Sequence, residues 1–157
     1  MKEISKRTGR EYKPFTYYGD PEAENIIIAM GSVTDTTKEV IDYLRAKGEK
    51  VGLISVHLYR PFSHKYFFNV FPGSVKKITV LDRTKEPGAP GEPLYLDIKD
   101  AFYQKCREVL ADTHLREPNS IYPPCIEAMK TVCPHKIDLF NATGKAALYQ
   151  YGSVEAR

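Results

Sequence analysis

The chain has 157 residues, enough for one globular domain with a hydrophobic core and too few for two comfortable ones. Its 23 basic and 20 acidic residues give a net charge of +3 without the long Lys/Arg stripe of a nucleic-acid binder. The first residues, MKEISKRTGREYKPF, are polar and basic, and the longest apolar run, NIIIAM, is too short to span a bilayer. We therefore expect a soluble, unsecreted protein that binds neither nucleic acid nor membrane.

The apolar pattern first predicts a strand at ENIIIAMGS and then a helix. The helix is indicated by apolar or small residues at helical spacing, namely Val33, Thr37, Val40, Ile41 and Leu44. Ser32 and Asp35 are spaced as a capping box at its start. The turn AMGSVTD has one glycine and no phosphate-binding fingerprint, so we interpret it as a structural helix start.

Two more strands and two more helices follow. KVGLISVHLY and KKITVL read as strands, and between them a short helix ends at Pro72-Gly73. Pro93 is the first residue of another helix, and one face of that helix carries Leu94, Ile98, Ala101 and Phe102. Apolar strands that alternate with helices predict right-handed βαβ units and a parallel sheet covered on both faces. The predicted class is α/β.

A proline-rich, charged loop, DRTKEPGAPGEP, joins the third strand to this last helix. Pro87, Pro90 and Pro93 restrict its backbone before anything binds, which lowers the entropy lost on docking. The loop is predicted at the carboxyl edge of the sheet, where ligands and partners of open α/β sheets bind. Its position favours a binding function.

The sequence also resembles a known family. TGREYKPFTYYGDPEAENIIIAMGSVTDT, YLRAKGEKVGLISVHLYRPF and above all KKITVLDRTKEPGAPGEPLYLDI resemble the second domain of pyruvate:ferredoxin (flavodoxin) oxidoreductase. The resemblance implies a three-layer α/β/α sandwich with a mainly parallel sheet, similar to the C-terminal domain of transketolases. We assign residues 1–103 to this domain and residues 104–157 to a divergent C-terminal segment. Because nothing in that segment resembles the strand that follows in the family, it stays open whether the sheet is complete and whether the chain is a fragment or a natural short protein.

The resemblance implies that the complete enzyme oxidatively decarboxylates pyruvate to acetyl-CoA and passes electrons to ferredoxin or flavodoxin. Thiamine diphosphate, Mg²⁺ and [4Fe-4S] clusters would belong to other domains of that cytoplasmic enzyme. This chain shows no recognisable thiamine site and no closely spaced cysteines. Cys125, Cys133 and His135 match no standard metal spacing, and with Cys106 the thiols fit a reducing compartment. We therefore predict no catalytic, cofactor or metal residue here, and an inactive isolated chain.

The expected role is a scaffold that contacts other domains of the same oxidoreductase. Candidate interdomain residues are those of the charged loop and of one strand end: Arg60, Asp82, Arg83, Lys85, Glu86 and Glu92. Mixed signs favour a complementary protein surface over a phosphate site, such as one for coenzyme A. A merely structural loop is the other reading, and Arg60 fits either a salt bridge to a neighbouring domain or an exposed strand end.

Two further points stay open. His57 stands where the family usually has an arginine, and we expect a packed or partly exposed histidine because no paired acid is visible nearby. As an alternative function, the chain would be an independent small α/β binding module that takes a phosphorylated ligand or a protein partner at the same carboxyl edge. Flanking coding sequence for the thiamine and iron–sulfur domains would discriminate between the two.

Overall fold

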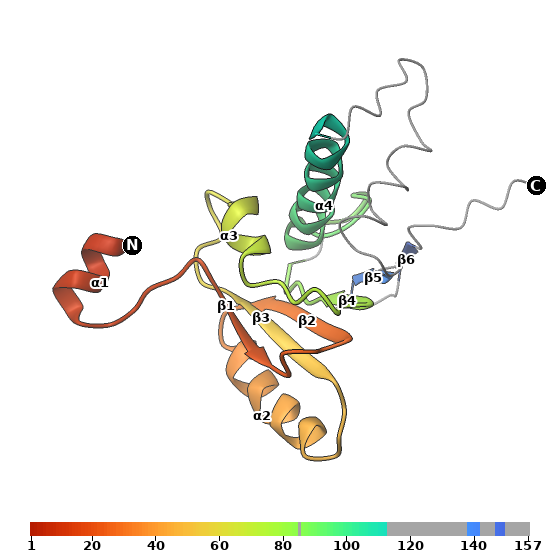
Figure 1. The fold of residues 1–157 in the computed structure, drawn as a ribbon. Coiled ribbons are helices and arrows are strands. Elements are labelled where there is room, and N and C mark those ends of the chain that lie inside the picture. The colour runs from red at the N-terminus through yellow and green to blue at the C-terminus, as the bar shows by residue number, and fades with distance from the viewer. Residues whose placement is uncertain (85, 113–137, 142–146, 150–157) are drawn as a thin grey trace, which may run out of the picture.

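The computed structural model describes residues 1–84, 86–112, 138–141 and 147–149. The helices are α1 (Lys2–Thr8), α2 (Val33–Arg45), α3 (His64–Phe68) and α4 (Pro93–Asp112). The strands are β1 (Phe15–Gly19), β2 (Asn25–Met30), β3 (Val51–Val56), β4 (Lys77–Val80), β5 (Asp138–Asn141) and β6 (Ala147–Tyr149). Figure 1 shows their arrangement.

The strands form one six-stranded sheet in the order β1-β3-β2-β4-β5-β6. β2 is parallel to both β3 and β4, and β4 is parallel to β5, whereas β1 and β6 join the two edges antiparallel. The connections from β2 through α2 to β3 and from β3 through α3 to β4 are the βαβ units that the sequence predicts.

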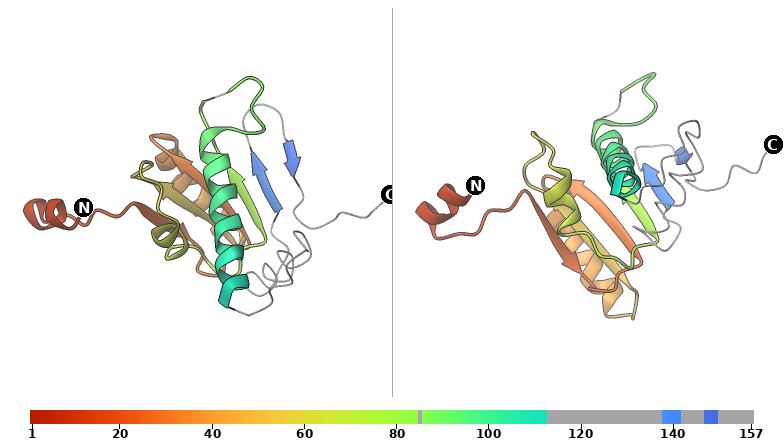
Figure 2. Two further views of the ribbon diagram at one scale, coloured as in Figure 1. Left: turned by 90° about the horizontal axis from the view of Figure 1, so that it is seen from above. Right: turned by 45° about the horizontal axis from the view of Figure 1, so that its top comes forward.

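Helices cover both faces of the sheet. Figures 1 and 2 show α2 on one face and α3 with α4 on the other, which gives three layers. A small cluster around Ile41 fills the α2 side, and a larger one around Phe67 and Ile98 fills the opposite side. The predicted α/β sandwich with a mainly parallel sheet is confirmed.

Strand burial explains why this sheet forms. β3 is buried along nearly its whole length, and β2 buries Ile26, Ile28 and Ala29, as strands covered on both faces must. At about 25 cal/mol per Å² of apolar surface, such side chains supply the main stabilisation.

An aromatic cluster joins α3 to the sheet and to α4. The Phe67 ring is fully buried and lies 5.1–6.1 Å, between ring centroids, from the rings of Phe15, Phe62, Phe68, Phe71 and Phe102. Most of these pairs meet edge to face, the geometry that aromatic quadrupoles prefer. A helix of only five residues is thereby anchored through its side chains.

The structure also differs from the sequence analysis. No strand was predicted in residues 104–157, yet β5 pairs in parallel with β4 and β6 extends the sheet further, so the sheet continues beyond β4. The predicted capping box is wrong: Ser32 has helical dihedral angles and no side-chain cap hydrogen bond, because the turn already closes through backbone bonds from Thr34 to Gly31 and from Asp35 to Ser32. Helix α1 and edge strand β1 were not predicted.

Candidate functional site: the loop between β4 and α4

The β4–α4 loop, residues 81–92, lies at the carboxyl edge of the parallel strands. β4 ends at Val80 and α4 begins at Pro93, as the sequence predicts. The amide of Leu81 donates to the Ile28 carbonyl of β2 at 2.8 Å, so the loop starts beside the neighbouring strand. The carboxyl end of β3, with Tyr59 and Arg60 beyond it, contributes to the same edge.

Asp82 caps helix α4 from twelve residues upstream. Its two carboxylate oxygens accept hydrogen bonds from the amides of Leu94 and Tyr95, each at 3.1 Å. The first amides of a helix lack partners within it, and a carboxylate at this position also interacts favourably with the helix dipole. Asp82 is half-buried and thus ties the start of the loop to its end.

Glu92 closes the loop from the other side. This residue is buried, with 7% of its surface exposed, and its carboxylate accepts a hydrogen bond from the Glu86 amide at 2.7 Å. Its carbonyl accepts the Leu96 amide at 2.9 Å. Asp82 and Glu92 therefore turn inward and hold the shape of the loop.

The outward charges of the loop belong to other residues. Arg83 and Glu86 are exposed, and Lys85 lies outside the described residues. The middle of the loop, residues 86–90, is exposed throughout. A loop fixed at both ends presents Arg83 and residues 86–90 to solvent in a defined arrangement, which lowers the entropy lost on binding.

Arg60 connects the end of β3 to α4. Its Nη1 lies 2.6 Å from Oδ2 of Asp97, its Nη2 donates to the Tyr59 hydroxyl at 3.0 Å, and its guanidinium lies 4.0 Å from the centroid of the Tyr59 ring. Stacking and a charge-assisted bond orient a planar cation well. The side chain is still 58% exposed, so Arg60 is both held within the domain and accessible.

Burial raises two pKa values at this edge. Burial is the largest cause that raises the pKa of Asp82, and the hydrogen bonds from Leu94 and Tyr95 oppose it. Burial, followed by the hydrogen bond with Asp97, raises the pKa of Tyr59 to about 12. Tyr59 is therefore a neutral phenol at physiological pH.

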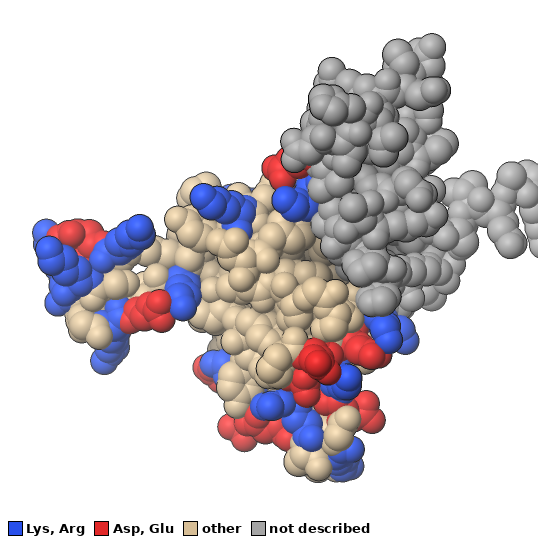
Figure 3. Space-filling view, in the orientation of Figure 1, with Lys and Arg blue, Asp and Glu red and all other residues tan. Residues whose placement is uncertain are grey.

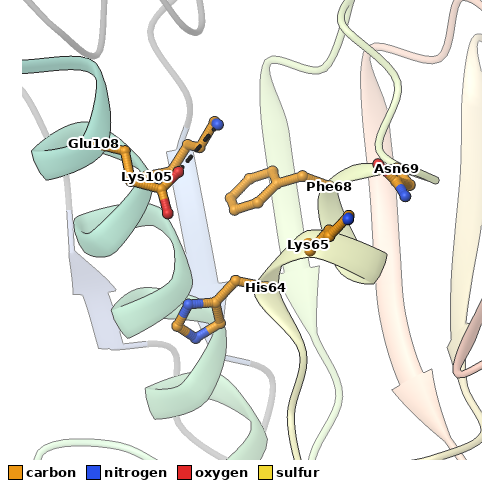
Figure 4. A pocket seen from close by; sticks show the side chains of 6 residues that line it. All are labelled: His64, Lys65, Phe68, Asn69, Lys105 and Glu108. Atoms are coloured by element: carbon orange, nitrogen blue, oxygen red, sulfur yellow. Dashed lines mark hydrogen bonds and ion pairs between the residues drawn. The ribbon is translucent and has the colours of Figure 1, made fainter. Parts of the chain in front are cut away.

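A pocket of about 290 Å³ lies between α3 and α4 (Figure 4). It is lined by His64, Lys65, Phe68, Asn69, Lys105 and Glu108. Lys105 pairs with Glu108 at 3.2 Å, and Nε2 of His64 is 3.7 Å from Asp100. Its residues come from α3 and from the later part of α4, whereas the candidate interdomain residues surround the start of α4.

Two negative findings apply to the described part of the chain. It contains no group of three or more His, Cys, Asp or Glu residues placed to hold a metal ion. None of its helices combines the length and the hydropathy needed to cross a membrane. Cys125, Cys133 and His135 lie outside the described residues.

His57 is exposed and its Nε2 is 2.8 Å from the Thr16 hydroxyl, so it bridges the ends of β1 and β3.

The fold and this edge define an α/β domain with a shaped, charged loop and, among the described residues, no metal centre. The family "Pyruvate:ferredoxin oxidoreductase core domain II" matches residues 23–116, which includes the whole loop. The chain belongs to this family.

Relatives agree with that assignment. The chain is 64% identical over 103 residues to the pyruvate-flavodoxin oxidoreductase of Enterobacter agglomerans and 57% identical over 102 residues to the probable pyruvate-flavodoxin oxidoreductase of Escherichia coli. It is 50% identical over 110 residues to the pyruvate:ferredoxin oxidoreductase of Moorella thermoacetica. These matches cover 65–70% of this chain and 9% of each relative. The chain thus corresponds to one small part of much longer proteins.

The loop lies between strand and helix as the sequence predicts, and the interdomain role of the loop and of Arg60 stays a prediction. The residues that hold them in place were not predicted. Asp97 was absent from the predicted site because its contact with Arg60 spans 37 positions, and Tyr59 gave no signal beyond its place in a strand. The inward roles of Asp82 and Glu92 were also missed. The capping role of Asp82 gave no sequence signal, because a helix cap is expected directly before the helix and Asp82 stands 12 positions before Leu94.

Proposed function

We propose that this chain acts as the second domain of a complete oxidoreductase that oxidatively decarboxylates pyruvate to acetyl-CoA. Ferredoxin or flavodoxin would accept the electrons. The chain itself would carry no catalytic residue and would serve as a scaffold whose β4–α4 loop contacts other domains. The family membership of residues 23–116 and the names of the relatives support this proposal.

The observation that carries the interdomain role is that some charged residues of the loop bond within the domain and others face solvent. Asp82 and Glu92 hydrogen-bond inward, whereas Arg83 and Glu86 are exposed. A loop that only connects two elements can do so without two carboxylates that fix its conformation. A binding loop benefits from them, because a surface that is ordered before docking loses less entropy on docking. Arg60, Asp82, Arg83, Lys85, Glu86 and Glu92 form the proposed interdomain surface and its support.

The cofactors of the complete enzyme would be held outside this domain. Thiamine diphosphate needs Mg²⁺ and a carboxylate for its aminopyrimidine ring, and iron–sulfur clusters need several cysteine thiolates. The cysteine spacing of this chain suits no such cluster. We propose a cytoplasmic location because reduced thiols fit that compartment.

A chimera tests the proposal. Residues 1–103 of this chain replace the matching stretch of the Enterobacter agglomerans enzyme, and pyruvate-dependent reduction of a viologen dye is measured with coenzyme A and thiamine diphosphate. We expect an active chimera and an inactive isolated chain. An inactive chimera that assembles normally, or turnover by the isolated chain, would contradict the proposal.

A further inference from the structure

The N-terminal arm, residues 1–14, stands away from the rest of the molecule. Figures 1 and 2 show α1 separated from the sheet and from the other helices in every view. None of the residues of α1 is buried. The apolar side chains of Ile4 and Tyr12 are 54% and 41% exposed.

The arm nevertheless has a specified local structure. Gly9 ends α1 in the left-handed conformation, with φ +68°, and donates its amide to the Ser5 carbonyl at 3.0 Å. The Tyr12 amide donates to the Ser5 hydroxyl at 2.9 Å, which folds the following residues back on the helix. A glycine at this position is a common helix terminator. The sequence therefore encodes a helix with an end, and not an irregular tail.

A helix of seven residues is not stable in water by itself, because nucleation is costly and isolated helices below about 12 residues are marginal. Helices in proteins are stabilised mainly by packing of an apolar face. In α1 no such packing exists among the described residues, although Ile4 is available for it. The arm thus has the properties of a segment that is stabilised by a surface outside this domain.

The excess of positive charge in the chain lies in the arm. Residues 1–14 contain five basic and two acidic residues, while the rest of the chain contains 18 of each sign. The net charge of +3 therefore belongs to the arm alone. Figure 3 shows Lys and Arg gathered on this projection. Both acids are paired within it, Glu3 with Arg7 at 3.1 Å and Glu11 with Lys13 at 2.9 Å.

Three arm cations, Lys2, Lys6 and Arg10, have no ion-pair partner among the described residues. The rest of the chain is formally neutral and offers no excess of acid to attract them. Residues 113–157 contain four acidic and five basic residues and are no better match. Because no described carboxylate pairs with these three cations, we look for the complementary charge on a surface outside this domain.

We propose that residues 1–14 dock onto an acidic protein surface in another part of the same oxidoreductase, with Ile4 and Tyr12 packed at the centre and Lys2, Lys6 and Arg10 at the rim. This inference rests on the proposed function. The arm and the β4–α4 loop would then be two separate attachment points of one domain.

Amide hydrogen exchange in the chimeric oxidoreductase tests this inference, because it reports on residues 2–13 directly. We expect these amides to exchange roughly tenfold more slowly in the chimera than in the isolated chain, and to lose that protection at about 0.5 M salt, where surface charges are screened. The combined substitution Lys2→Glu, Lys6→Glu and Arg10→Glu should restore fast exchange. A control with the same charge change on the body, Lys47→Glu, Lys65→Glu and Lys77→Glu, should leave the arm protected.

Three outcomes would overturn the inference. In the first, the arm amides exchange equally fast in the chimera and in the isolated chain. In the second, the charge reversal of the arm leaves their exchange slow in the chimera. In the third, nuclease treatment removes the protection, which would identify a nucleic acid as the partner. Loss of pyruvate oxidation by the chimera is read separately and bears on the proposed function, because arm protection is measured whether or not the chimera turns over.

Discussion

At the scale of single residues, two serines show how one hydroxyl stabilises or destabilises depending on its partners. The Ser55 hydroxyl in β3 is buried and has no hydrogen-bond partner among the described residues. The Ser74 hydroxyl donates to the Ala23 carbonyl at 3.0 Å. An unpaired buried hydroxyl retains its desolvation cost, whereas a paired one contributes about 1 kcal/mol.

We therefore expect opposite effects from the same substitution. Ser55→Ala should leave the free energy of unfolding unchanged or raise it by up to about 1 kcal/mol, and Ser74→Ala should lower it by about 1 kcal/mol. Urea denaturation of both variants measures the difference. A larger loss for Ser55→Ala than for Ser74→Ala would mean that the Ser55 hydroxyl has a partner.

Asp82 gives a prediction for pH. Because burial raises its pKa in the folded state, the folded protein holds that proton more tightly than the unfolded chain does. The contribution of this carboxyl to stability is then greatest at low pH and declines as the pH rises from about 4 to the folded-state pKa. The stability of the wild type relative to Asp82→Asn should fall across this window and stay constant above it. A relative stability that increases with pH would show that the two backbone hydrogen bonds outweigh burial.

At the scale of elements, the parallel core was predictable and its edges were not. β2, β3 and β4 each appear in the sequence as an apolar run between turn residues, which is typical of strands covered on both faces. Edge strand β1 has Thr16 and two tyrosines that are only partly buried, and β5 has four residues, too few for a period to show. Whether a short segment forms an edge strand depends on its hydrogen bonds to the neighbouring strand, and these are not visible in the periodicity of the sequence.

In helix α2 the sequence predicted the bounds of the helix but not which of its residues are buried. Its bounds agree with the prediction, but its buried residues are Thr34, Thr37 and Ile41, while Val33 and Val40 are 42% and 46% exposed. The two threonine hydroxyls donate to backbone carbonyls at 2.8 and 2.7 Å, so they are satisfied beside the sheet. In the site, likewise, the loop was predictable from its prolines and charges, whereas the contact between Arg60 and Asp97 depends on tertiary packing.

Strand β3 offers a prediction about close packing. The Tyr17 ring of β1 lies over Gly52, and a Cβ on Gly52 would lie 2.7 Å from the ring carbon Cζ. Gly52→Ala should displace this ring and lower the free energy of unfolding by about 1–3 kcal/mol, the usual cost of overpacking. Gly73→Ala is the control, because a Cβ there meets nothing within 4 Å. Equal midpoints of thermal unfolding for the two variants would disprove this account of the β1–β3 contact.

At the scale of the whole molecule, the chain is a three-layer domain with a shaped loop at its carboxyl edge and a basic arm that projects from its body. It spans 9% of the length of the relatives that it resembles. The exposed loop residues Arg83 and Glu86 and the arm cations Lys2, Lys6 and Arg10 take no part in the core. Both features therefore suit the proposed contacts with other domains.

The central claim is that the β4–α4 loop docks onto another domain, and reversing the charges of its two basic residues, Arg83 and Lys85, tests it most directly. Arg83→Glu and Lys85→Glu are introduced together into the chimeric oxidoreductase and into the isolated chain, and thermal unfolding is measured with the Michaelis constant for coenzyme A. Docking predicts that the chimera loses cooperativity and unfolds at a lower temperature, while the isolated chain melts as before, since exposed loop charges contribute little to folding. A coenzyme A constant raised severalfold with unchanged unfolding of the chimera would contradict docking and identify the loop as an anion site.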